Sequence, residues 1–61
     1  LYEMAAKRGN ATAQYNLGVM YAKGDGIEQS YLTAKEWWTK AAAQGHKNSN
    51  DALKKLDEHG L

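Results

Sequence analysis

The sequence contains no cysteine, no proline and no phenylalanine. The missing cysteine excludes a disulfide scaffold, although it does not fix the compartment. The missing proline, together with the many alanines, favours helices along the whole chain. Long apolar runs are missing too, since none approaches the ~20 residues that a membrane-spanning helix needs. These absences indicate a helical protein segment without a membrane span.

An excess of charge of one sign is also missing, because the 61 residues carry a net charge of +1 with acidic and basic side chains interspersed. The sequence has no basic stripe of the kind that would indicate a nucleic-acid partner, so we expect none. A chain of this length buries only about 60% of its unfolded surface, so it would be marginally stable alone. It begins at Leu1 rather than methionine and shows no signal peptide. We expect a cut N-terminus and a native C-terminus, and a cytoplasmic, periplasmic or secreted location all stay open.

The main positive feature is a near-repeat at a spacing of 36 residues. Small and apolar residues recur where helices would touch, and glycines recur where helices would end. A period in this range is typical of solenoids of helix pairs, in which each unit buries its apolar face against the next. The identical pairs are Ala5 and Ala41, Ala6 and Ala42, Gly9 and Gly45, Leu17 and Leu53, and Gly24 and Gly60.

Apolar periodicity predicts the end of a helix over residues 1–8, followed by three helices. Asn10 and Ser30 are expected to cap two of them, because their side chains can accept backbone N–H bonds. Gly18 lies inside a predicted helix, where glycine costs up to about 1 kcal/mol relative to alanine, so we expect a neighbouring helix to approach closely there. The predicted helices cover residues 11–23, 31–44 and 48–58.

Two adjacent tryptophans lie among alanines on one face of the predicted helix 31–44. Trp37 is expected in the core, whereas the ring of Trp38 could lie partly open. Glu36 and Lys40 are spaced for an i,i+4 ion pair worth a few tenths of a kcal/mol.

The last predicted helix is more polar than the others. The repeat places Lys54 where Gly18 stood and Asp57 where Tyr21 stood. A further unit could not pack tightly there, and terminal repeats turn their outer face polar for this reason.

Three strings carry a resemblance: Ala13 to Tyr21, then Gly24-Asp25-Gly26-Ile27, then Ala34 to Gly45. Together they resemble the Sel-one-like repeat (SLR), a relative of the tetratricopeptide repeat. The resemblance assigns residues 1–9 to the end of a preceding repeat, 10–45 to one complete repeat, and 46–61 to a following, capping helix. It implies an all-α fold of antiparallel helix pairs in a right-handed tetratricopeptide-like α/α solenoid, acting as an adaptor in protein complexes. We also take a bacterial source as an expectation, although the sequence does not identify the organism.

The same resemblance implies a binding surface, because tetratricopeptide relatives hold peptides on the concave face formed by the first helix of each pair. Tyr15 and Val19 stand out there as apolar residues away from the predicted core face, although an ordinary exposed helix surface or a contact with another copy would also explain them. The residues carried over by helical position are Thr12, Tyr15, Asn16, Val19 and Lys23, with Lys55 in the last unit. Ala22, Asp51, Glu58 and His59 lie on the same face.

The sequence gives little support for a metal site, a phosphate-binding loop or a catalytic site. His46 and His59 are read as surface histidines, because no cysteine and no His-x-x-x-His pair accompanies them. Gly24-Asp25-Gly26 follows a helix and lacks the residues of a phosphate loop. Ser30 and Ser49 have no histidine base nearby in sequence. We expect no catalytic residue, no cofactor and no metal site, and therefore not an enzyme.

The sequence thus predicts a non-catalytic interaction or scaffold module that binds a protein or peptide. The alternatives are a capping unit that only stabilises a repeat array, and a regulatory subunit of a larger complex. Leu1, Tyr2 and Met4 belong to a helix remnant that could be too short to hold itself. A homo-oligomer through this N-terminal end is therefore also expected.

Overall fold

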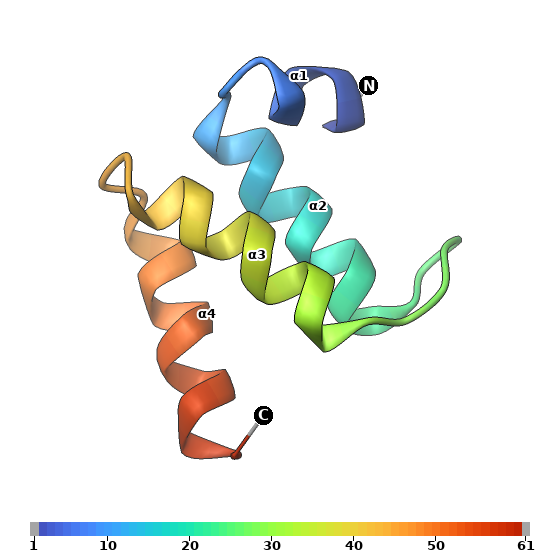
Figure 1. Ribbon diagram of the computed structural model, residues 1–61, viewed down its shortest axis with the longest axis vertical. Helices are drawn as coiled ribbons and strands as arrows, with labels where there is room; N and C mark the ends of the chain where they lie inside the picture. The colour runs from blue at the N-terminus through green and yellow to red at the C-terminus, as the bar shows by residue number, and fades with distance from the viewer. Residues whose placement is uncertain (1, 61) are drawn as a thin grey trace.

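The computed structural model describes residues 2–60 (Figure 1) and, apart from Tyr2, their side chains. The described residues form helices and no strand, which confirms the predicted all-α class. Each helix packs on the next one along the chain. Figure 1 shows α3 running antiparallel to α2, and α4 returning in the direction of α2. The helices are α1 (Tyr2–Lys7), α2 (Ala11–Lys23), α3 (Tyr31–Ala42) and α4 (Lys47–Glu58).

Helix ends follow the expected capping residues at three places. The Asn10 side chain accepts the backbone N–H of Ala13 at 2.9 Å, and α2 begins there. Ser30 caps α3 by accepting the N–H of Thr33 at 3.2 Å. Gly24 ends α2 at φ 70°, a left-handed conformation that glycine adopts at no steric cost.

The junction between α3 and α4 differs from the prediction. Helix α3 ends at Ala42, two residues early, and α4 begins at Lys47, one residue early. The cap of α4 is His46, whose Nδ1 accepts the N–H of Ser49 at 3.2 Å and lies 2.8 Å from its hydroxyl. His46 was predicted to be a plain surface residue. The 36-residue spacing pairs it with Asn10, so the repeat itself carried the missed signal.

The core consists of two small clusters on either side of α3. The cluster toward α1 contains Ala6, Ala13 and Leu17, with Trp37 partly buried against it. The cluster toward α4 contains Ala34, Trp38 and Leu56. Adjacent tryptophans of α3 therefore serve opposite clusters, and α3 joins the two halves of the molecule.

The predicted order of burial of the two tryptophans was wrong. Trp38 is only 5% exposed, whereas Trp37 is half-buried and lies beneath the ammonium of Lys40, 4.8 Å from its ring centre. Lys40 makes this cation–π contact instead of the expected ion pair with Glu36. Both rings share the alanine face in the sequence pattern, and only the approach of α4 decides which one is enclosed.

Gly18 explains how α2 and α3 come so close. The indole Nε1–H of Trp38 donates to the carbonyl oxygen of Tyr15 at 3.0 Å, so the edge of the ring that carries Nε1 lies against the backbone of α2. A Cβ added at Gly18 would lie 2.4 Å from that nitrogen, so the indole would have to shift to make room for any side chain. The expected close approach at Gly18 is confirmed.

A buried glutamine holds α1 in place. Gln14 donates from Nε2 to the carbonyl of Ala6 at 2.9 Å and accepts from Nε2 of Gln44 at 3.0 Å. The short helix is thus attached to α2 and to the segment after α3. Of the residues expected to drive self-association, Met4 is 56% exposed, while Leu1 and the side chain of Tyr2 lie outside the described residues. Self-association stays a prediction.

Candidate interaction groove between α2 and α4

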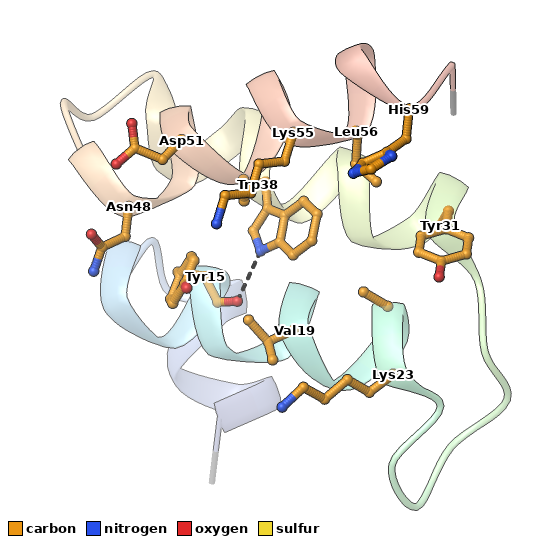
Figure 2. Close-up of a pocket in the computed structure, with 12 residues that line it drawn as sticks. Tyr15, Val19, Lys23, Tyr31, Trp38, Asn48, Asp51, Lys55, Leu56 and His59 are labelled. Atoms are coloured by element: carbon orange, nitrogen blue, oxygen red, sulfur yellow. Dashed lines mark hydrogen bonds between the residues drawn. The ribbon is translucent and has the colours of Figure 1, made fainter.

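An open groove of about 770 Å³ runs between α2 and α4 (Figure 2). Its two walls come from these helices, and its floor is formed by Trp38 of α3 and Leu56 of α4. A volume of this order is within the usual range for ligand-binding sites. The lining residues are Tyr15, Val19, Ala22 and Lys23 from α2, Tyr31 and Trp38 from α3, Asn48, Asp51, Ala52, Lys55 and Leu56 from α4, and His59.

Helical spacing places the lining side chains of each wall on one face of their helix. Tyr15, Val19 and Lys23 are four residues apart, so they follow one face of α2. Asp51 and Lys55 are four apart on α4 and repeat this arrangement on the opposite wall. Because α2 and α4 run in the same direction on either side of α3, their inner faces border the same groove.

The floor of the groove is fixed by packing. Trp38 is 5% exposed and Leu56 is 7% exposed, so only a small part of each side chain reaches the groove. The hydrogen bond from Trp38 to the Tyr15 carbonyl fixes the position of the indole. A partner would therefore meet an apolar surface that is already in place, which lowers the entropic cost of binding.

Tyr15 forms one end of the groove and is held between two other rings. Its ring centre lies 6.4 Å from that of Trp38 and 5.2 Å from that of His46, with both pairs tilted. Distances in this range are typical of favourable aromatic contacts. The cap residue of α4 thus also positions a wall of the groove.

The rim carries charges of both signs. Lys23 and Lys55 are exposed, as is Asp51, and none of them makes an ion pair with another described residue. The ion pair that the described part of the chain does contain joins Lys7 and Glu3 at 3.5 Å, far from the groove in sequence. The groove therefore combines an apolar middle with charged groups that are open to a partner.

Some of the expected site residues line the groove in the structure, and others do not. Tyr15, Val19, Lys23 and Lys55 line the groove, as do Ala22, Asp51 and His59. Thr12 is exposed and Asn16 half-buried, and neither lines it. Glu58 is exposed and also lies outside the lining.

Several lining residues were missed. The ring of Trp38 was expected to lie partly open but was not placed on the binding surface, Leu56 was not assigned to it, and Tyr31 was taken as the start of a helix. A groove between two helices is closed from behind by the helix that joins them, so α3 could have been included on topology alone.

In residues 2–60, no three histidine, aspartate or glutamate side chains gather closely enough to hold a metal ion. None of the four helices is long and apolar enough to cross a membrane, as far as the structure describes the chain.

Helices that each pack on the next one along the chain are typical of helical-repeat proteins. The Sel1 repeat family model matches residues 1–10 and 11–46, and the chain belongs to this family. Sel1 repeats generally mediate protein–protein interactions.

A sel1-like repeat-containing protein of Acanthamoeba polyphaga mimivirus is 44% identical over 45 residues. The match covers 74% of this chain but only 8% of that protein, so the chain spans a small part of the relative's length. The relative is viral, so the expected bacterial source has no support from it. No solved structure matches the chain.

Proposed function

We propose that this chain is a non-catalytic interaction module, part of a longer Sel1 repeat protein, and that it holds a segment of a protein partner between α2 and α4. The groove with its fixed tryptophan floor is the observation that supports this proposal most. An apolar side chain entering it gains about 0.8 kcal/mol for each methylene removed from water. A single groove of this size suits weak and transient binding, which neighbouring repeats would strengthen.

The partner surface in this proposal comprises Tyr15, Val19 and Lys23 on one wall and Lys55 on the other. Thr12 and Asn16 would contact a partner only if it extends beyond the groove toward the start of α2. The repeat boundaries at residues 10 and 45 belong to the same proposal, with 46–61 as the following segment, whose helix α4 completes the groove.

A second candidate function is structural, because α4 does not offer the contact that α2 offers. Gly18 lets an indole lie against the α2 backbone, while the corresponding residue of α4 is the exposed Lys54. A lysine side chain there would block the same approach of another tryptophan. In this second proposal, α4 ends an array and adds stability and solubility without recognising a partner.

Shortening a groove wall should weaken binding. We expect Val19→Ala to lower the affinity for a groove-bound peptide about fivefold to tenfold, because it removes two buried methyl groups from the contact. Peptides selected on the 61-residue chain from a random twelve-residue display library serve as probes, and fluorescence anisotropy measures their affinity.

The matched control is Leu32→Ala, which shortens an apolar side chain that is 72% exposed on α3 and outside the groove. It should leave peptide affinity unchanged. Equal effects of the two substitutions would contradict binding in the groove, and a library that yields no peptide would favour the structural candidate.

A further inference from the structure

Polar groups are distributed unequally along the groove. Because α2 and α4 run in the same direction, the 36-residue spacing pairs Tyr15 with Asp51, Val19 with Lys55, and Lys23 with His59. Figure 2 shows Asn48 and Asp51 at the end where α4 begins, and Tyr31 and His59 at the opposite end. In the same view the Lys55 side chain reaches back toward Asn48 and Asp51, and its ammonium lies between Asp51 and Trp38.

The two lysines face the groove from opposite walls. Lys23 comes from the last turn of α2 and Lys55 from the last turn of α4, and both line the groove. Asp51 stands one turn before Lys55, in the favourable order for an i,i+4 ion pair, yet the two do not pair. Both ammonium groups can therefore contact a carboxylate on a partner without first breaking an ion pair to a described residue.

The apolar middle lies beside these cations. Trp38 and Leu56 form its floor, and Val19, Ala22 and Ala52 form its sides. None of these five side chains offers a free polar group inside the groove, since the Trp38 indole N–H already donates to Tyr15. This middle fits an apolar side chain and would reject a charged one, because it could not replace the lost water contacts.

From this arrangement we infer that the occupant is a partner segment with one apolar anchor side chain and acidic side chains next to it. The anchor lies over Trp38, and the carboxylates lie between Lys23 and Lys55. This inference rests on the proposed function and adds the chemistry of the partner to it.

Four synthetic peptides of ten residues test the inference. Each carries a central leucine with three charged residues on one side and glutamines elsewhere, and the charged residues are glutamates or lysines placed before or after the leucine. NMR titration of the 61-residue chain measures affinities down to the millimolar range. We expect the better glutamate peptide to bind about tenfold tighter than its lysine counterpart, the combined effect of two partly exposed charge pairs.

The decisive variant combines Lys23→Glu with Lys55→Glu, which should reverse the preference to the lysine peptide. The matched control combines Lys35→Glu with Lys54→Glu, which changes the net charge equally at two exposed sites outside the groove. This control should keep the preference for glutamate.

The possible outcomes separate the two proposals. Peptides that bind with an affinity sensitive to Val19→Ala but without a charge preference would overturn the inference and leave the proposed function standing. The same would follow if both double variants changed the preference alike. If no peptide binds at all, both proposals fail.

Discussion

Replacing Trp38 with alanine is expected to unfold most of the chain. The indole is 5% exposed, forms the centre of the cluster toward α4, and hydrogen-bonds to α2. Truncating a buried aromatic residue costs about 3–5 kcal/mol. At the usual stability per residue, 61 residues give a free energy of unfolding of roughly 3–9 kcal/mol. The loss therefore consumes much or all of the stability, and far-UV circular dichroism with urea would show it.

The neighbouring tryptophan is the control. Trp37→Ala removes a ring of the same size from a half-buried position, where Lys40 covers part of it. We expect a loss of about 1–2 kcal/mol, because less of the ring leaves water on folding. A larger loss for Trp37→Ala than for Trp38→Ala would contradict the assignment of the two rings.

Gly18→Ala is expected to destabilise the chain by about 1–3 kcal/mol, the usual cost of overpacking. On helix propensity alone, this substitution would stabilise α2 by up to about 1 kcal/mol. The opposite sign is expected because the new Cβ would lie 2.4 Å from Nε1 of Trp38, and the indole is held by its hydrogen bond. Urea unfolding measures the difference in free energy.

Two further variants isolate the cause. Thr12→Ala, at an exposed position of the same helix, should be neutral or slightly stabilising. Gly18→Ala should cost less in a Trp38→Phe background, because phenylalanine lacks the pyrrole ring that meets the new Cβ. Equal costs in both backgrounds would rule out the contact with Trp38 as the reason for glycine.

Local signals in the sequence predicted much of the fold. Asn10, Ser30 and Gly24 act through their own backbone and the next turn, so their effects can be read without knowing the tertiary structure. Gly18 could be interpreted because a glycine in a helix needs an external reason.

The features that the sequence predicted poorly depend on contacts between helices that are far apart in the sequence. Trp37 and Trp38 differ by one position on a shared alanine face, and the position of α4 decides between them. His46 is rare as a cap, so only its pairing with Asn10 through the repeat could have revealed it.

In the candidate groove, too, some residues could be predicted from local signals in the sequence and others depend on tertiary packing. Tyr15, Val19 and Lys23 follow from helical spacing on α2, and the equivalent position on α4 adds Lys55. The Trp38 floor does not follow from that spacing, because it lies on α3 and enters only when the three helices assemble. Periodicity gives the walls of such a groove, and tertiary packing supplies its base.

The central claim is that a partner segment lies between α2 and α4, over Trp38. The most direct test is a two-dimensional ¹H–¹⁵N NMR titration of the chain with a library-selected peptide. We predict that the indole N–H of Trp38 and the amides of Val19, Ala52 and Lys55 shift together, while the amides of Leu32 and Lys35 on the opposite side of α3 stay in place. Saturable shifts confined to the outer face of α3, with the Trp38 indole unchanged, would contradict the account.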